Sequence, residues 1–211
     1  LFLFYGNDFF DISPLDPAIT GATLTTVNGS STITVNKASH NLLKGRYITL
    51  SSVTVTGASG FTAADLQKSY EILSVTTDNF TIQGPSNETG SGMTAAGAAT
   101  INPYVVVGPT IQTGGYGWST STWGASTWGT ARATSSVILD PGNWSLDNFG
   151  QVLVATIFNG ETFTWDAGAT NPRTIRASKT TSGAQTTNNP TTTRISVVSD
   201  RDRHLFHMGT E

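Results

Sequence analysis

The residue types that most often carry chemistry are scarce in this sequence. Its histidines are His40, His204 and His207, and it has no cysteine. A separation of three residues suits a pair of metal ligands on a helix, whereas on a strand it places His204 and His207 on opposite faces. The lack of cysteine removes thiolate zinc sites and cysteine nucleophiles. We therefore predict ordinary edge-strand histidines, no metal site and no cofactor.

The carboxylates offer one further catalytic possibility. Asp147, Glu161 and Asp166 could supply the acid pair of a glycoside hydrolase, which needs two carboxylates about 5–10 Å apart in a groove. Asp147 and Asp166, however, stand in turn-like positions, where Asp is a common turn former. Asp200 and Asp202 alternate with arginines, a pattern typical of a charged hairpin tip and not of a Ca²⁺ site. With no phosphate-binding loop and no nucleophile elbow, the sequence predicts a protein without catalytic residues.

Composition narrows the class of protein. The 211 residues carry 11 Lys and Arg against 14 Asp and Glu, a formal net charge of −3. This balance excludes a strongly basic protein that coats DNA, because phosphate neutralisation needs an excess of cations. No apolar run approaches about 18 residues, so we expect no membrane span. Thr, Ser and Gly, rather than Lys and Glu, fill the polar positions, which favours an all-β chain. Because the chain begins with Leu1 and not Met, we expect it to be part of a longer polypeptide.

The first 18 residues differ from the rest in their aromatic content. Five aromatic residues occur within the first ten, and Pro14 and Pro17 follow them. The prolines exclude a helix and favour extended backbone before them. Residues 1–18 are therefore expected to form an N-terminal arm or lead-in strand, whose aromatic rings need a partner surface on this chain or on a neighbouring subunit.

Residues 19–102 are expected to form a small β-barrel or sandwich, because short strands recur about every 10 residues. Asn28-Gly29 predicts a type I′ hairpin turn, and Ile33 and Val35 alternate with threonines as in a half-buried strand. Residues 61–68 predict a helical turn with Thr62 as its N-cap. Strands are expected at 23–27, 30–35, 46–51, 52–56, 70–75 and 79–83, and residues 84–100 are expected to form a loop or a weakly specified hairpin.

Residues 103–135 form a Gly-rich connector with a local repeat. Trp118, Trp123 and Trp128 recur every five residues, a spacing that fits neither a helix face nor strict strand alternation. We expect these rings to anchor the connector against a β-surface. A contact with another subunit and a stacking platform for sugars or bases are the alternatives.

Residues 136–211 begin a different β-unit. The segment 151–158 is almost wholly apolar, which predicts a strand buried on both faces. After Asn159-Gly160, the next strand alternates, with Phe163 and Trp165 on one side. Trp144 and Trp165 are candidates for packing or subunit contact. Residues 167–193 are polar, and segments 194–199 and 204–209 predict a further hairpin.

The arginines of the second half form a candidate interface. Residues 111–211 contain seven acidic and seven basic residues, six of which are arginines. Arginine makes forked hydrogen bonds that suit interfaces. The candidates for an interface or for charge along a channel are Arg173, Arg176, Arg194, Arg201 and Arg203. Solvated turns are the simpler interpretation of the same residues.

Several motifs resemble those of bacteriophage tail proteins. WSLDNFG, NGETFTWD and ISVVSDRDRHLFHMG, with YGWSTSTWGASTWGT before them, resemble the blade-like repeats of the nozzle, or tail tubular protein B, of short-tailed phages. TLTTVNGSSTITVNKASHNLLKGRYITLSS resembles a small β-barrel module of phage tail and baseplate polypeptides. A propeller blade takes about 40–45 residues, so residues 136–211 hold fewer than two blades and the unit is expected to be incomplete.

The resemblance implies a structural protein of the virion tail. It implies a hexameric ring of identical subunits that encloses the DNA ejection channel, contacts an adaptor ring or tail fibres, and lets DNA pass without specific binding. We expect such a protein to work by symmetric assembly. A receptor-recognition or fibre-attachment module with Trp118, Trp123 and Trp128 exposed in a groove is the second hypothesis. A polysaccharide depolymerase that uses Asp147, Glu161 or Asp166 is the third.

Overall fold

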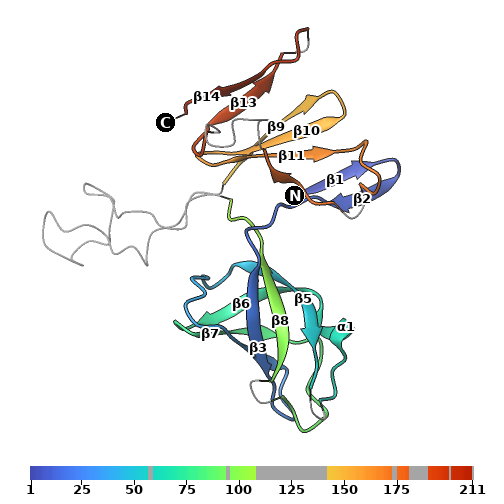
Figure 1. Ribbon diagram of the computed structural model, residues 1–211, viewed down its shortest axis with the longest axis vertical. Helices are drawn as coiled ribbons and strands as arrows, with labels where there is room; N and C mark the ends of the chain where they lie inside the picture. The colour runs from blue at the N-terminus through green and yellow to red at the C-terminus, as the bar shows by residue number, and fades with distance from the viewer. Residues whose placement is uncertain are drawn as a thin grey trace, which may run out of the picture. The chain divides into compact units, whose positions relative to one another are not determined.

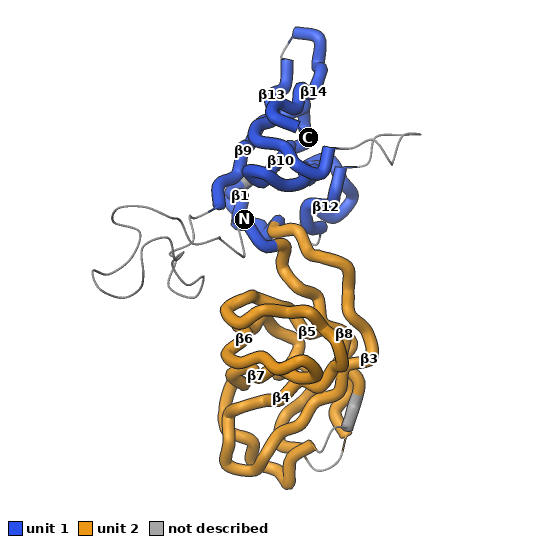
Figure 2. The backbone as a smooth tube through the Cα atoms, turned by 90° about the vertical axis from the view of Figure 1, so that its left-hand side faces the viewer, with its two compact units in different colours: residues 1–12, 106–211 blue, residues 13–105 orange. Residues whose placement is uncertain are grey.

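The chain is all-β, as predicted, and one of its parts is a closed barrel. The computed structural model describes residues 1–56, 59–93, 96–107, 142–172, 175–180, 190–199 and 201–210. These residues contain strands β1 to β14 and the helix α1 (Figure 1). The chain divides into two compact units, coloured separately in Figure 2: Leu1–Ile12 with Val106–Glu211 is unit 1, and Ser13–Val105 is unit 2. The predicted arm of residues 1–18 is therefore divided, and its first twelve residues belong with the C-terminal half of the chain.

Unit 2 is a barrel closed in the strand order β3-β4-β7-β6-β5-β8. Its core is apolar, with Leu24, Ile33, Val35, Phe80 and Ile82 among the side chains that are fully buried. The alternation predicted at Ile33 and Val35 is confirmed by the burial pattern of their strand. The strands are β3 (Ile19–Thr25), β4 (Thr32–Asn36), β5 (Tyr47–Thr54), β6 (Ser69–Val75), β7 (Asn79–Gln83) and β8 (Ala96–Pro103).

Three local predictions for the barrel differ from the structure. The segments 46–51 and 52–56 form the single strand β5, in which a bulge lies near Ser52, whose φ is +50°. The segment predicted as a loop or weak hairpin ends in β8, which pairs with both β3 and β5. At Asn28-Gly29 only the glycine has positive φ, so the predicted type I′ turn is wrong.

The helix α1 (Ala63–Leu66) begins as predicted. Thr62 accepts a hydrogen bond from the Asp65 backbone N–H, and the Asp65 carboxylate accepts one from the Thr62 backbone N–H. This reciprocal capping box satisfies two backbone donors that the first turn of a helix leaves without partners. With four residues, α1 is far too short to cross a membrane, and it is the one helix in the part of the chain that the structure describes.

A buried carboxylate fixes the loops at one end of the barrel. Glu88 is almost fully buried, and its side-chain oxygens accept hydrogen bonds from Thr26 Oγ1 at 2.7 Å, Ser59 Oγ at 2.7 Å, the Gly90 N–H at 2.9 Å and the Gly60 N–H. Burial alone raises the pKa of Glu88, but these four donors outweigh burial and lower the pKa to about 2. A carboxylate with this many donors stays ionised inside the protein and joins three loops.

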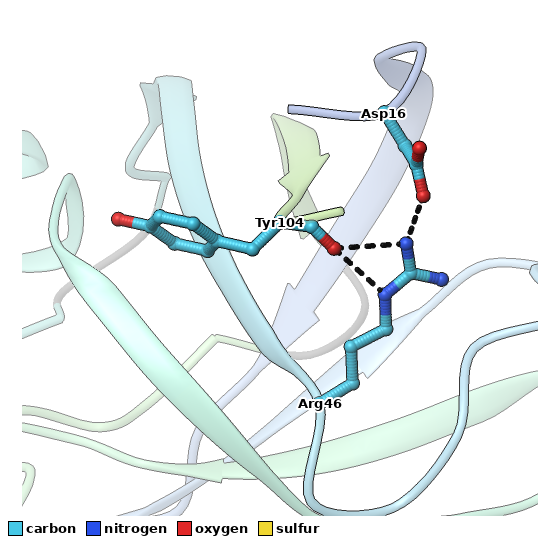
Figure 3. Close-up of polar contacts among 3 residues, drawn as sticks. All are labelled: Asp16, Arg46 and Tyr104. Carbon is cyan, nitrogen blue, oxygen red and sulfur yellow. Dashed lines mark hydrogen bonds and ion pairs between the residues drawn. The ribbon is translucent and has the colours of Figure 1, made fainter. Parts of the chain in front are cut away.

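A second polar contact joins the chain segment that enters unit 2 to the segment that leaves it (Figure 3). The Arg46 guanidinium donates to the Tyr104 carbonyl through Nε at 3.2 Å and Nη2 at 3.0 Å, and Nη2 also pairs with the Asp16 carboxylate. Nearby, the Asp16 N–H donates to the Pro103 carbonyl at 2.8 Å. The segments through which the chain enters and leaves unit 2 therefore lie side by side.

Unit 1 is built on a four-stranded antiparallel sheet in the order β12-β11-β10-β9 (Figure 1). Val154 and Ala155, adjacent residues of β10, are both buried, which confirms the prediction of a strand covered on both faces. Phe163 and Trp165 share one face, as their alternation predicted. The strands are β9 (Trp144–Phe149), β10 (Val152–Ile157), β11 (Thr162–Asp166) and β12 (Ser178–Lys179).

The carboxylate network predicts the effect of replacing Glu88. We expect Glu88→Gln to lower the free energy of unfolding of the barrel by about 2 kcal/mol, because charge-assisted hydrogen bonds are exchanged for weaker ones. Denaturant unfolding measures this loss. Glu71→Gln, at an exposed position of the same barrel, is the control and should change the free energy by less than about 0.5 kcal/mol. Equal effects of the two changes would contradict the role of the network.

The lowered pKa of Glu88 also predicts a dependence on acid. The unfolded chain takes up a proton near the ordinary pKa of 4.5, whereas the folded carboxyl does so only near a pKa of about 2. The contribution of Glu88 to stability, about 3 kcal/mol, is complete above pH 4.5 and is lost as the pH falls to about 2. Unfolding of the parent and of Glu88→Gln between pH 6 and pH 2, measured in about 0.5-unit steps, should show a shallower decline for the variant.

Candidate assembly surface

Two hairpins contact opposite faces of the unit 1 sheet. The first is formed by β1 (Phe2–Tyr5) and β2 (Asp8–Asp11), and the second by β13 (Ile195–Val198) and β14 (Leu205–Met208). Each hairpin has an inner face against the sheet and an outer face directed away from it. The inner contacts determine which side chains are left outside.

The N-terminal hairpin is a tight one. Gly6 and Asn7, at its turn, both have positive φ, as a two-residue type I′ turn requires. On the inner face, the buried Phe10 ring lies 6.0 Å from the Trp165 ring, centroid to centroid. The strand end is fixed by the Ala177 N–H, which donates to the Ile12 carbonyl at 3.0 Å. Residues more than 150 positions apart in the sequence thus share one core.

An ion pair accompanies this contact. Arg176 Nη2 lies 2.9 Å from Asp11 Oδ2, and both side chains are half-buried. Arg176 was predicted as a residue of an interface or channel, and the structure places it in a contact within unit 1. These groups hold the N-terminal hairpin in place through charge as well as through ring packing.

The outer face of the N-terminal hairpin is aromatic. Phe2, Phe4 and Phe9 point away from the sheet and remain 72%, 58% and 78% exposed. Phe4 and Phe9 are cross-strand partners, and their ring centroids are 4.9 Å apart. We call these three residues the N-hairpin face. So much exposed aromatic surface on a two-stranded hairpin is typical of a contact site.

The C-terminal hairpin docks on the other face through hydroxyl groups. Ser196 Oγ lies 2.6 Å from Thr156 Oγ1 and 2.8 Å from His207 Nδ1, and Thr156 Oγ1 lies 2.9 Å from Thr162 Oγ1. Burial lowers the pKa of His207, so the neutral imidazole is favoured in this position. Four polar side chains therefore form one continuous chain of hydrogen bonds between hairpin and sheet.

Asp147 strengthens the same docking. Its carboxylate accepts hydrogen bonds from the Val198 N–H at 2.7 Å and from the Asn148 N–H at 2.8 Å. These bonds lower the pKa of Asp147. The carboxylate thus joins strand β9 to strand β13, in a role that is structural.

The outer face of the C-terminal hairpin is apolar. Ile195, Val197, Phe206 and Met208 are 44%, 37%, 53% and 49% exposed. They form two adjacent cross-strand pairs, Ile195 with Met208 and Val197 with Phe206. We call these four residues the C-hairpin face. Unit 1 therefore presents apolar surface on both hairpins, on opposite sides of its sheet.

The tryptophans and arginines that the sequence analysis proposed as packing or interface residues lie in different environments. Trp165 is buried and donates through Nε1 to the Ile175 carbonyl at 3.0 Å, and half-buried Trp144 lies edge-on to Phe163 at 6.2 Å. Exposed Arg194 lies over the Phe158 ring at 5.9 Å. Arg201 and Arg203 are exposed near the hairpin tip. The predictions at Trp118, Trp123, Trp128 and Arg173 lie outside the described residues.

The carboxylates considered for hydrolysis are engaged separately. Glu161 pairs with Lys179, and Asp166 Oδ1 accepts a hydrogen bond from the Gly168 N–H at 2.8 Å within its own turn. Asp147 and Asp166 lie on strands β9 and β11, with β10 between them. Among the residues that the structure describes, no three His, Asp or Glu side chains come together as metal ligands. His204 and His207 lie on opposite faces, as their spacing predicted for a strand.

Sequence reasoning missed the surface that the structure shows most clearly. The sequence analysis expected the aromatic residues near the N-terminus to need a partner surface. It did not predict that they form a hairpin that packs Phe10 against the unit 1 sheet and leaves Phe9 exposed. Gly6-Asn7 was the available signal, because adjacent residues that tolerate positive φ mark a two-residue hairpin turn. No signal of this kind separates the exposed Ile195 and Val197 from core residues, because their types are those of a buried strand.

The two neighbouring phenylalanines of β2 provide a matched test of this docking. We expect Phe10→Ala to lower the free energy of unfolding of unit 1 by about 3 kcal/mol, because it removes a buried ring beside Trp165. Phe9→Ala, one residue away and exposed, should change it by less than about 0.5 kcal/mol. Denaturant unfolding gives the energies, and hydrogen exchange at residues 2–12 reports release of the hairpin. A similar loss for both variants would contradict the assignment of inner and outer faces.

Comparison with known proteins gives no match: no family model, no curated protein and no solved structure is similar to this chain.

Proposed function

We propose that this chain is a structural component of a bacteriophage tail, a ring subunit of the nozzle or tail-tube type that lines or closes the DNA ejection channel. The observation that carries the proposal is the pair of apolar faces on opposite sides of one sheet. Apolar patches of this kind mark contacts between proteins, since a soluble monomer gains nothing from exposing them. A protein that works by symmetric assembly needs such surfaces.

The architecture supports the same proposal. Strands β9 to β12 follow one another in an antiparallel meander, which is the arrangement within one blade of a propeller. The sheet is flanked by further hairpins, as a blade is flanked by its neighbours. The motifs that resemble phage tail proteins coincide with these elements, in WSLDNFG at β9, NGETFTWD at β11 and ISVVSDRDRHLFHMG at the C-terminal hairpin.

The polar groups of unit 1 favour a structural role over an enzymatic one. Asp147 holds β13 through a backbone N–H, Glu161 pairs with Lys179, and Asp166 closes a turn. A glycoside hydrolase needs two carboxylates directed into one groove. Each of these three carboxylates instead pairs with a nearby donor, which fits a structural role better than a catalytic one.

The composition of the phage particle tests the proposal. We expect quantitative mass spectrometry of purified particles to find this polypeptide in a fixed copy number, and electron microscopy with a labelled chain to place it at the tail. A ring subunit must be present in the same number in every particle, because a closed symmetric interface fixes the number of copies. A soluble single copy that is absent from purified particles would rule the proposal out.

A further inference from the structure

We propose that the C-terminal hairpin is a pH-sensitive element: the hydrogen bonds that hold it on the unit 1 sheet reverse their direction when His207 takes up a proton, and mild acid releases the hairpin. The proposal goes beyond the proposed function, because it concerns a contact within a single copy of the chain. The hairpin carries the C-hairpin face, so its release also moves that apolar surface.

The docking contact is built from buried hydroxyl groups. Thr162 Oγ1 lies 2.9 Å and Ser196 Oγ lies 2.6 Å from Thr156 Oγ1. Ser196 Oγ also lies 2.8 Å from Nδ1 of His207, its partner on the neighbouring strand of the hairpin. All three hydroxyl groups are buried, so water does not replace a partner that one of them loses. The protonation of His207 therefore decides the direction in which they donate.

Neutral His207 leaves each of these hydroxyl groups with an acceptor. When the imidazole proton is on Nε2, Nδ1 accepts a hydrogen bond from Ser196. Ser196 Oγ then accepts from Thr156, and Thr156 Oγ1 accepts from Thr162. Because a hydroxyl group has one hydrogen to donate, every hydroxyl hydrogen in the contact is used.

A protonated His207 reverses this order. Both ring nitrogens of an imidazolium carry hydrogen, so Nδ1 donates to Ser196. Ser196 then donates to Thr156, and Thr156 donates to Thr162. Among the residues that the structure describes, Thr162 Oγ1 has no second partner, so its hydrogen is left buried without an acceptor. A buried donor without an acceptor weakens the contact in which it lies.

The charged groups of the sheet do not offset this effect. On the face that the hairpin covers, β9 contributes Asp147 and β11 contributes Asp166, and β10 contributes no charged side chain. The Asp147 carboxylate accepts from the Val198 and Asn148 N–H groups, and Asp166 closes its own turn. Burial lowers the pKa of His207, so the docked hairpin favours the neutral ring.

The other charged or titratable side chains of the hairpin lie outside this contact. Arg194 lies over the Phe158 ring, and the His204 ring lies beside the exposed Phe206 ring. The hairpin tip is exposed at Arg201, Asp202 and Arg203. Of the hairpin residues that the structure describes, His207 is therefore the titratable one that faces the sheet.

Two titratable groups set the pH range of release. The pKa of His207 lies below the ordinary value of 6.5 when the hairpin is docked, so docking is strongest above pH 6.5 and weakens as the pH falls below it. The pKa of Asp147 is lowered from 3.8, so its contribution is complete above pH 3.8 and is lost in stronger acid. In mild acid, His207 is therefore the group that controls release.

Hydrogen exchange at one amide reports this release. The Val198 N–H donates to Asp147 Oδ2 on β9 at 2.7 Å, so its protection depends on contact between hairpin and sheet. Its protection factor in the full chain is measured by NMR at about pH 7.5 and about pH 5, corrected for intrinsic exchange, with the amides of β10 as the internal reference. We expect the Val198 protection to fall about five- to tenfold at the lower pH, as one buried donor loses its acceptor, and that of β10 to stay unchanged.

A matched pair of variants separates the two histidines of the hairpin. His207→Asn places a side-chain oxygen that can accept from Ser196 and does not titrate, so we expect equal protection at the two pH values. His204→Asn, on the opposite face of the hairpin, should keep the fall seen in the parent. No fall in the parent, or the same fall in His207→Asn, overturns the proposal.

A second measurement on the parent decides the question if His207→Asn does not dock. NMR titration of the imidazole signals gives the midpoint of each histidine. We expect the Val198 protection to be lost together with the protonation of His207, at a midpoint below 6.5. A loss that follows the midpoint of a different group overturns the proposal. Both measurements use single copies of the chain, so their outcome is independent of whether the chain is found in phage particles.

Discussion

A two-stranded hairpin has two faces, and docking on a sheet covers one of them. This constraint applies to unit 1, because the N-terminal hairpin and the C-terminal hairpin each pack their inner face against the central sheet. Phe10 goes in and Phe9 stays out; Ser196 goes in and Val197 stays out. Period-two alternation permits no other arrangement. Since the outward residues of both hairpins are apolar, unit 1 is well bonded internally and still exposes two apolar surfaces to water.

The means of docking differ between the two hairpins. The N-terminal hairpin is held by ring packing, a backbone hydrogen bond and an ion pair, whereas the C-terminal hairpin is held by a chain of hydroxyl groups that ends at His207. A buried hydroxyl stabilises a contact only when its partners are correctly placed. Thr156 and Ser196 meet that condition, so the C-terminal hairpin has a defined position on the sheet even though few apolar side chains hold it there.

Local patterns predicted much of this fold from sequence. The capping box at Thr62, the alternation at Phe163 and Trp165, and the doubly buried strand β10 each depend on residues close together in the chain. The failures involve distant residues. Gly29 donates to the Glu88 carbonyl, so the conformation at Asn28-Gly29 is decided from about 60 residues away. Strand β8 forms in a Gly- and Ala-rich segment because β3 and β5 supply partners on both edges.

The entry and exit segments of unit 2 lie side by side, and this has a consequence for the order in which the chain folds. The N-terminal hairpin is synthesised before the barrel, but Trp165 and Ala177, which complete its core, are synthesised only after the barrel. During that interval Phe2, Phe4, Phe9 and Phe10 have no body to cover them. The barrel has its own core, and Arg46 joins the segments that enter and leave it, so the barrel can fold during this interval. Because the barrel is inserted between the two parts of unit 1, the hairpin must wait for a partner that is synthesised after the barrel, and closing this long-range contact is expected to be slow.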